Sequence, residues 1–283
     1  MLEDKINYSV ALIKKAEILS LQMSNRGFHL AFSGGKDSIV LYHIAKLAGV
    51  KFHAEMQITT LDPPEVMHFI RKEYPDVKLN LPPLSFYKLI KKKKMLPLRQ
   101  ARYCCEVLKE QSGVGSCVLI GIRKSESSRR AKRKEVELTS KSKKKSQLIK
   151  QDSFDIDNEI THSCINGDDK VLISPIFNWS DKDIWAFIKL YQLKYPSLYD
   201  EGFKRIGCLF CPMGNSKTKQ LELSKYPKVA DTIKKSIQYL IDNNGYFNNY
   251  NATADEIFNW YISNKSAKEY FHNLRNQTEL KFK

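Results

Sequence analysis

Residues 31–38 read Ala-Phe-Ser-Gly-Gly-Lys-Asp-Ser, and this stretch decides the fold. The short, bulky run 28–32 that leads into the polar residues predicts a buried strand. The apolar residues that follow recur at helical spacing and predict a helix: Ile39, Leu41, Ile44 and Ala45. Because further strand-like and helix-like stretches alternate along the chain, we expect an α/β fold with a parallel sheet and helices on both faces.

The loop between this strand and helix suits the binding of an anion. Glycine has no Cβ, so Gly34 and Gly35 allow positive φ angles and a close approach of the backbone to a ligand. The first amides of the helix have no partner within it and point outward. The other polar residues contribute hydroxyl groups, a positive charge, and a carboxylate that caps the helix or holds a Mg²⁺ ion beside phosphate: Ser33, Ser38, Lys36 and Asp37.

The pattern Ser-Gly-Gly-x-Asp-Ser lacks the spacing of the kinase-type phosphate loop. It resembles the PP-loop of the N-type ATP pyrophosphatases and of the phosphoadenosine phosphosulfate (PAPS) reductases. The resemblance implies a Rossmann-like, five-stranded parallel sheet and an adenine nucleotide substrate that reacts at or near its α-phosphate. It also places Asp62, after a second predicted strand at 52–59, beside the adenosine.

A second polar element follows the predicted strand 117–122. Guanidinium groups at the carboxyl end of a strand are well suited to bidentate contact with phosphate or sulfate oxygens. The PP-loop family has a similar element, Gly-x-Arg-x-x-x-Ser-x-x-Arg, which Gly121, Arg123, Ser127 and Arg130 match. The resemblance therefore implies that these four residues bind the nucleotide, and that Lys36, Asp37 and Arg123 are the catalytic group.

Six cysteines in a chain expected to be cytoplasmic favour metal or redox chemistry over a disulfide framework. Cys208 and Cys211 form a Cys-x-x-Cys, while Cys104 and Cys105 are adjacent. Adjacent cysteines point in different directions, which suits a bulky cluster better than one zinc ion. The arrangement resembles the [4Fe-4S] site of iron-sulfur sulfonucleotide reductases; zinc is the alternative. Cys117 is expected in the core, and Cys164 lies in a polar stretch near His162.

The composition sets the class of partner. The chain of 283 residues carries a formal net charge of +16, and residues 123–150 contain 12 basic and 3 acidic residues, a net of +9. We therefore expect an anionic partner, with nucleic acid as a candidate. No apolar run approaches the roughly 18 residues of a membrane helix, and the first residues do not open a signal peptide, so we expect no membrane partner.

Three regions are expected. Residues 1–26 form an amphipathic helix, and residues 27–212 form the nucleotide-binding domain, with a flexible basic insertion near 131–169. Residues 213–283 form a helical, aromatic-rich region.

Two functions fit this reading. The first is reduction of adenylyl sulfate or its 3′-phospho form beside a [4Fe-4S] cluster. No cysteine follows Cys211, whereas the family has a cysteine nucleophile near its carboxyl terminus. This reaction therefore requires another thiol, from Cys164, from a thiol-, electron- or sulfur-donor protein, or from a small-molecule donor. The second is adenylation of a nucleic-acid acceptor by ATP, followed by sulfur transfer, as in PP-loop thiolation enzymes and DNA phosphorothioation relatives.

Overall fold

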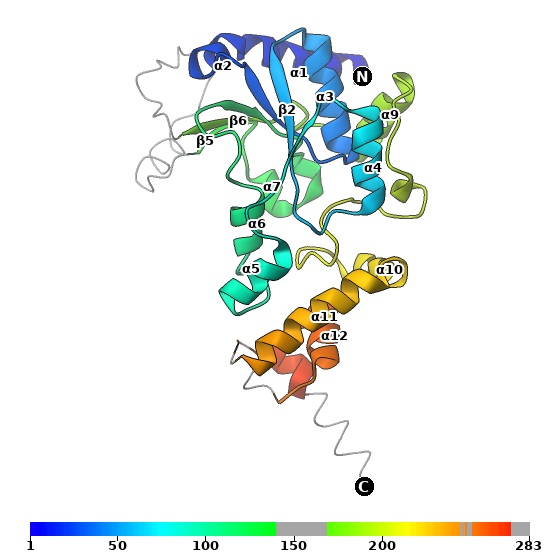
Figure 1. The fold of residues 1–283 in the computed structure, drawn as a ribbon. Helices are drawn as coiled ribbons and strands as arrows, with labels where there is room; N and C mark the ends of the chain where they lie inside the picture. Colours follow the sequence, from blue (N-terminus) through cyan, green and yellow to red (C-terminus); the bar gives the residue numbers. More distant parts are fainter. Residues whose placement is uncertain (140–168, 244, 246, 248–250, 273–283) are drawn as a thin grey trace. The chain divides into compact units, whose positions relative to one another are not determined.

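The computed structural model describes residues 1–139, 169–243, 245, 247 and 251–272, and Figure 1 draws the remainder as a thin trace. The described chain divides into two compact units, each assembled from separate stretches. Unit 1 comprises residues 1–57, 64–80 and 111–206. Unit 2 comprises residues 58–63, 81–110 and 207–283. Cys164 and most of the predicted basic insertion lie outside the described residues.

Unit 1 is built on a six-stranded sheet with the order β3-β2-β1-β4-β6-β5. Its strands are β1 Phe28–Ala31, β2 Phe52–Gln57, β3 Lys78–Asn80, β4 Cys117–Leu119, β5 Val136–Thr139 and β6 Lys170–Ile173. Every neighbouring pair is parallel except β5 with β6, which is antiparallel. The predicted five-stranded parallel sheet is therefore corrected to a six-stranded, mostly parallel one. Residues 136–139 pair with β6 although the sequence predicted a flexible insertion there.

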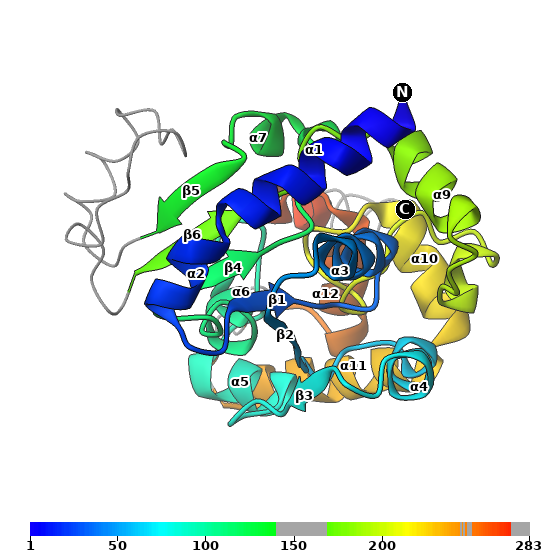
Figure 2. The same ribbon diagram turned by 90° about the horizontal axis from the view of Figure 1, so that it is seen from above.

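The helices of unit 1 are α1 Leu2–Lys15, α2 Glu17–Met23, α3 Lys36–Ala48, α4 Pro64–Glu73, α7 Ser128–Ala131 and α9 Asp181–Leu190. Two 3₁₀ turns, η1 Lys124–Glu126 and η3 Ser197–Tyr199, complete this part of the fold. Helices α1, α3 and α9 pack against one another, as Figure 2 shows. The single helix expected near residues 3–25 is instead two helices that meet at Ala16.

The strand-loop-helix predicted around residue 33 is present as β1, the loop and α3. Gly34 has a φ of +69°, and a Cβ at this position would lie 2.7 Å from Ile70 Cδ1 and 2.8 Å from Val66 Cγ1 of α4. Glycine is therefore needed both for the backbone conformation and for the space. Helix α3 begins at Lys36, and its N-cap Gly35 provides no side-chain hydrogen bond to the first-turn amides.

Unit 2 is helical within the described residues. Its helices are α5 Phe86–Lys93, α6 Tyr103–Leu108, α10 Ser216–Lys225, α11 Pro227–Asp242 and α12 Ala254–Ser263. Helix α11 packs against α5, α10 and α12. The apolar side chains at this junction are fully buried, among them Leu89, Ile90, Ile233, Ile237 and Phe258. The aromatic residues of the carboxyl-terminal region thus serve largely as the core of a helical bundle.

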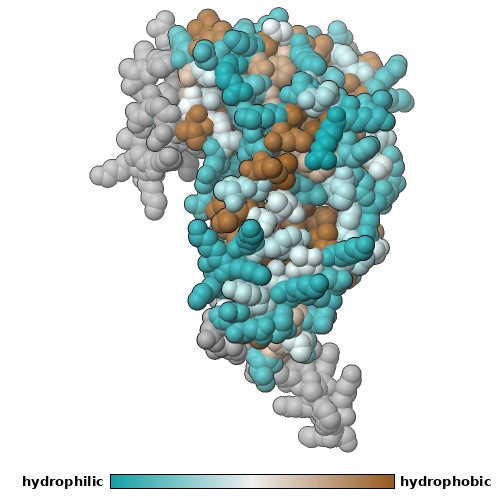
Figure 3. All heavy atoms as spheres, in the orientation of Figure 1, coloured by the Kyte–Doolittle hydropathy of each residue, from teal (hydrophilic) through white to brown (hydrophobic). Residues whose placement is uncertain are grey.

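Hydrophilic residues cover much of the face shown in Figure 3, with smaller hydrophobic patches between them. Among the described residues, no helix has both the length and the apolar character needed to cross a bilayer.

Candidate functional site

The loop after β1 is closed by its own serines. Ser38 Oγ accepts a hydrogen bond from the Ser33 amide at 3.2 Å and donates one to the Gly35 carbonyl at 2.8 Å. Ser33 Oγ lies 3.2 Å from Ser38 Oγ and is on an exposed residue, whereas Ser38 is buried. Ser38 therefore shapes the loop from within, and Ser33 presents its hydroxyl group to solvent or to a ligand.

Lys36 is buried at the start of α3, with 4% of its surface exposed. Its Nζ lies 3.2 Å from Asp181 Oδ1 and donates to the Lys204 carbonyl at 3.2 Å. The Lys36 amide, one of the first-turn amides of α3, donates to the hydroxyl group of Tyr199 at 2.9 Å. Burial of Tyr199 raises the pKa of its hydroxyl well above the usual range, so Tyr199 is neutral here.

Arg123 is also buried, with 3% exposed, and it joins the loop to α9. Its Nε donates to Asp37 Oδ1 at 2.6 Å, and one terminal nitrogen donates to Asp181 Oδ1 at 3.1 Å. Its other terminal nitrogen donates to Ser125 Oγ at 3.0 Å. The structure thus brings Lys36, Asp37 and Arg123 together, as the sequence predicted, and adds Asp181 as a carboxylate that contacts both cations.

The rest of the arginine element lies against the same site. Gly121 packs so closely on α3 that a Cβ there would lie 3.3 Å from the Asp37 carbonyl group. Ser127 caps α7 by accepting a hydrogen bond from the Arg130 amide, and Arg130 forms an ion pair with Glu126. Burial, together with the positive charge of Arg205, lowers the pKa of Arg130 to about 10. This part of unit 1 therefore concentrates several cations around two carboxylates.

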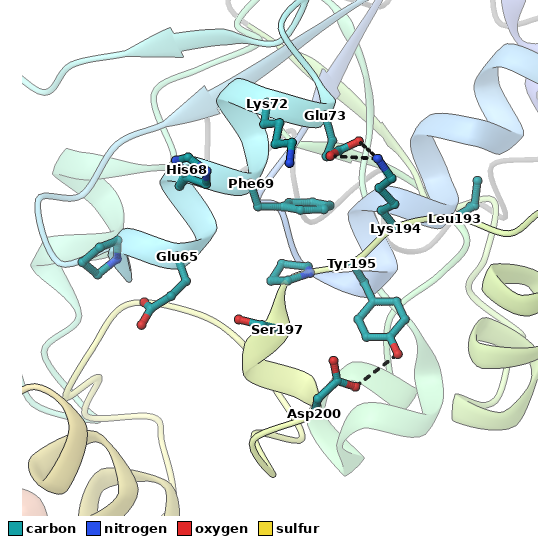
Figure 4. Close-up of a pocket in the computed structure, with 12 residues that line it drawn as sticks. Glu65, His68, Phe69, Lys72, Glu73, Leu193, Lys194, Tyr195, Ser197 and Asp200 are labelled. Atoms are coloured by element: carbon teal, nitrogen blue, oxygen red, sulfur yellow. Dashed lines mark hydrogen bonds and ion pairs between the residues drawn. The ribbon is translucent and has the colours of Figure 1, made fainter.

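A pocket of about 800 Å³ lies in the same unit, between α4 and residues 193–200 (Figure 4). Phe69, Tyr195 and Pro196 line it, and its charged side chains are partly paired: Lys194 contacts Glu73 at 3.0 Å, and Tyr195 donates to Asp200 at 3.1 Å. The segments that build this pocket also support the loop, through Val66 and Ile70 of α4 and through Tyr199. The pocket is thus a mostly apolar cavity on the segments that support the loop after β1.

In unit 2 the structure brings the four predicted metal-binding cysteines together. Cys104 and Cys105 lie in the first turn of α6, and Cys208 and Cys211 lie in the loop before α10. Electrostatic interactions link the Cys104 sulfur to those of Cys105, Cys208 and Cys211. A hydrogen bond from Cys104 lowers the pKa of Cys105 to about 6, and the negative charge of Cys208 raises the pKa of Lys109. All four cysteines are half-buried and free of disulfides.

Asp62 lies in unit 2 and supports the turn 59–62. Its Oδ2 accepts a hydrogen bond from the Thr59 amide at 2.6 Å, and its charge acts on Lys109. The Leu61 carbonyl in turn accepts from the Leu209 amide at 2.8 Å, which ties this turn to the Cys-x-x-Cys loop. The structure therefore groups Asp62 with the cysteines of its own unit, and its predicted role at the adenosine stays a prediction.

Helix α10 fixes the Cys-x-x-Cys loop through a buried carboxylate. Phe210, between the two cysteines, has a φ of +53°, and its amide donates to Glu222 Oε2 at 2.7 Å. Burial raises the pKa of Glu222 to about 7 and lowers that of the neighbouring Lys219 to about 8. Lys219 Nζ donates to Asn264 Oδ1 at 2.7 Å and to the Tyr261 carbonyl at 3.1 Å, which connects α10 to α12.

The raised pKa of Glu222 predicts a pH-dependent stability. A carboxyl group whose pKa is about 7 in the folded chain, against an ordinary pKa of 4.5, binds its proton more tightly when the chain is folded. Stability should therefore fall as the pH rises from about 4.5 to about 7, by roughly 3 kcal/mol at most. We expect Glu222→Gln, which keeps an acceptor for the Phe210 amide, to remove this fall. The free energy of urea unfolding at pH 5 and pH 7 measures it.

Glu106→Gln is the matched control, since Glu106 is an exposed carboxylate of the same unit. This variant should show the same pH dependence as the unchanged protein. If Glu222→Gln lost as much stability as the unchanged protein between pH 5 and pH 7, Glu222 would not be the titrating group.

Tyr261 of α12 contributes a polar atom that the sequence did not reveal. Its hydroxyl group is buried and has no hydrogen-bond partner among the described residues. Burial raises its pKa well above the usual range, and the sulfurs of Cys104, Cys208 and Cys211 act on it in the same direction. A buried hydroxyl group without a hydrogen-bond partner costs free energy. The Tyr261 hydroxyl group therefore indicates that a hydrogen-bond acceptor binds near the cysteines. Sequence patterns could not find it, because Tyr261 reads as one of several aromatic core residues.

Comparisons with known proteins show the family of this chain. The sequence profile of the phosphoadenosine phosphosulfate reductase domain matches residues 27–213. An uncharacterized protein of Methanocaldococcus jannaschii is 29% identical over 243 residues, which are 80% of this chain and 52% of that protein. An adenosine 5′-phosphosulfate reductase of Shouchella clausii is 43% identical over 42 residues, which are 15% of this chain and 17% of that enzyme. This chain thus spans about half, or less, of the curated relatives that it matches.

Among solved structures, the PAPS reductase of Candida auris in its phosphate complex matches this chain with a TM-score of 0.46 and 18% identity. The match covers 74% of this chain and 95% of that one. The U34-tRNA thiolase of Methanococcus maripaludis with its [4Fe-4S] cluster has a TM-score of 0.42 at 12% identity, and covers 91% of this chain and 80% of that one. The profile match extends over about two thirds of the sequence and contains the loop, the arginine element and all four cysteines of the metal-binding prediction. The chain belongs to the phosphoadenosine phosphosulfate reductase domain family.

Proposed function

We propose that this protein is an enzyme that reduces a sulfonucleotide, adenylyl sulfate or its 3′-phospho form, and carries a [4Fe-4S] cluster on Cys104, Cys105, Cys208 and Cys211. The main support for nucleotide binding is the pair of buried cations at the loop, Lys36 and Arg123. Both contact Asp181, whose side chain is 61% exposed, so an incoming anion can replace that carboxylate without unfolding the site.

Two features of unit 2 fit a cluster. Among the described residues, only His29, His53 and Glu55 form a set of three potential metal ligands whose donor atoms all lie within 4.8 Å of one another. No three of the cysteine sulfurs in this part of the chain lie that close together. The four sulfurs are therefore spread more widely than the edges of about 3.8 Å that a zinc ion with Zn–S bonds near 2.3 Å would impose. The buried hydroxyl group of Tyr261, on which three of these sulfurs act electrostatically, would supply a donor for a sulfur acceptor. When bound, such a cluster supplies redox-active iron held by thiolates.

The loop residues would act on the nucleotide. The amides at the start of α3, Ser33 and Lys36 would bind phosphate oxygens, and Arg123 would bind the sulfate or the α-phosphate. A thiolate then attacks the sulfate sulfur, the bond from that sulfur to the bridging oxygen breaks, and the nucleotide leaves with the electron pair. A second thiol attacks the resulting sulfur–sulfur bond, which releases sulfite and leaves a disulfide.

That thiol would come from a donor protein or a small thiol. Of the described cysteines, four are assigned to the cluster, and Cys117 is fully buried in β4 beside Met23. This observation also favours a second candidate, in which ATP adenylates a nucleic-acid acceptor and sulfur is then transferred to it. The net charge of +9 over residues 123–150 supports a polyanionic acceptor.

Turnover separates the two reactions. Anaerobically purified protein would be incubated with adenylyl sulfate or PAPS plus dithiothreitol, and separately with ATP and an RNA or DNA acceptor. Sulfite release would support the reductase. Pyrophosphate from ATP without any sulfite would exclude it and favour adenylation, and binding to nucleic acid that weakens steeply with salt would point the same way.

A further inference from the structure

Three side chains of the types that bind metal ions meet on one face of the sheet of unit 1. His29 of β1 and His53 of β2 are direct partners in the parallel register, so their side chains stand side by side. Glu55 follows His53 by two residues, and alternate residues of a strand point to the same face. The fold therefore brings the His29 imidazole to one place with the His53 imidazole, which is 24 positions later in the sequence, and with the Glu55 carboxylate.

The distances fit a common centre. His29 Nδ1 lies 3.3 Å from His53 Nε2, and Glu55 oxygens lie 4.0 Å from each of these nitrogens. Two nitrogens bound to one tetrahedral ion at 2.0–2.1 Å are about 3.3–3.4 Å apart. The carboxylate is too distant to hydrogen-bond either ring, so it faces the two nitrogens without contacting them. A small rotation of the carboxylate would complete a three-ligand set.

The three side chains are largely buried. His29 is 2% exposed, and the side chains of His53 and Glu55 are 18% and 11% exposed. The outer nitrogen of His29, Nε2, is buried and has no hydrogen-bond partner in the part of the chain that the structure describes. Gly113 leaves the room that the His29 ring needs, since a Cβ there would lie 2.9 Å from its Cδ2. Buried polar groups of this kind normally have partners.

We propose that His29, His53 and Glu55 form a binding site for a divalent transition-metal ion such as Zn²⁺, with a fourth coordination position open. Two imidazoles and one carboxylate are a ligand set that Zn²⁺ and Fe²⁺ accept. The side of the group at His53 and Glu55 is its more exposed side and provides the path of entry. The site is in the amino-terminal half of β1, whereas the phosphate loop follows the carboxyl end of that strand.

Two cationic side chains compete with a metal ion for the Glu55 carboxylate, and this competition provides a test of the site. Arg26 and Lys78 approach Glu55 Oε1 at 3.4 and 4.0 Å, and Asn80 donates to Oε2 at 2.8 Å. The Arg26 and Lys78 side chains are 57% and 63% exposed, so both can turn into solvent when a metal ion binds. Lys78→Gln should therefore strengthen zinc binding by about 2–5-fold, the worth of one exposed charge pair. A Glu55 that serves only in ion pairs would show no such gain.

The direct test is metal content with ligand assignment. Purified protein would be loaded with excess Zn²⁺, desalted, and analysed for zinc and iron by mass spectrometry and for zinc ligands by X-ray absorption. We expect one zinc with nitrogen and oxygen ligands in the unchanged protein and in His68→Ala, an exposed histidine of α4. His53→Ala should lose that zinc and keep its iron. Zinc bound through sulfur alone, or retained in His53→Ala, would overturn the proposal.

Discussion

Cys208→Ser is expected to abolish the iron and the visible absorbance of the purified protein. Four thiolates hold a [4Fe-4S] cluster, and serine does not replace a thiolate on iron at neutral pH. Cys208 also acts on Lys109, whose raised pKa reflects the negative charge of this sulfur. Iron and sulfide analysis after anaerobic purification should give about four of each per chain for the unchanged protein and less than about a tenth of that for the variant.

Cys117→Ala is the matched control, because Cys117 is the one other described cysteine and is buried in β4, with its sulfur 3.6 Å from Met23 Sδ. Its iron content should equal that of the unchanged protein. If the unchanged protein instead carried one zinc and no iron, the cluster assignment would be wrong and the four cysteines would hold a mononuclear site. An equal loss of iron in Cys117→Ala would mean that iron is lost through unfolding rather than through loss of a ligand.

The local parts of this fold could be predicted from the sequence. Strand β1, the glycine loop and the start of α3 depend on residues within about twenty positions of one another, so apolar periodicity and two adjacent glycines define them. Ser180 and Asp183 likewise form a capping box at the start of α9. Short-range chemistry of this kind leaves a readable pattern in the chain.

The partners of the site could not be predicted, because they come from distant parts of the chain. Tyr199 reaches the Lys36 amide across 163 positions, and Asp181 reaches Arg123 across 58. Neither the type nor the spacing of these two residues predicts the partner that each one contacts. Strand β5 was missed for a related reason: its residues lie in a Lys-rich stretch, and only pairing with β6 makes a strand of them.

The same limit applies to unit 2. Glu222 and Tyr261 read as ordinary residues of helices, yet the fold turns one towards the Phe210 amide and the other towards the cysteine sulfurs. The roles of these two side chains depend on their burial. A single sequence predicts burial only for segments with a strong apolar periodicity. The histidine–glutamate group is similar, since the register of β1 against β2 decides that His29 meets His53.

Arg123→Ala is expected to weaken nucleotide binding by at least about 30-fold, because truncating one member of a buried, hydrogen-bonded charge pair costs about 2–5 kcal/mol. Arg123 is the buried cation with the most side-chain partners at the loop, and its Nε lies 2.6 Å from Asp37. Calorimetric titration with adenylyl sulfate and with ATP measures the loss. The nucleotide affinity of Arg123→Lys should lie between those of the unchanged protein and Arg123→Ala, since an ammonium group keeps the charge but not the bidentate geometry.

Truncation of Arg123 also leaves Lys36 as the remaining cationic partner of Asp37 and Asp181, so lower thermal stability should accompany the weaker binding. Asp181→Asn separates the two effects. Asp181 is 61% exposed and contacts both Lys36 and Arg123, so its neutralisation should leave the fold intact and free both cations for an anion. We expect this variant to bind the nucleotide up to about 5-fold more tightly. Weaker binding by Asp181→Asn would mean that Asp181 itself holds the ligand, and that the cations of this loop serve the fold rather than the nucleotide.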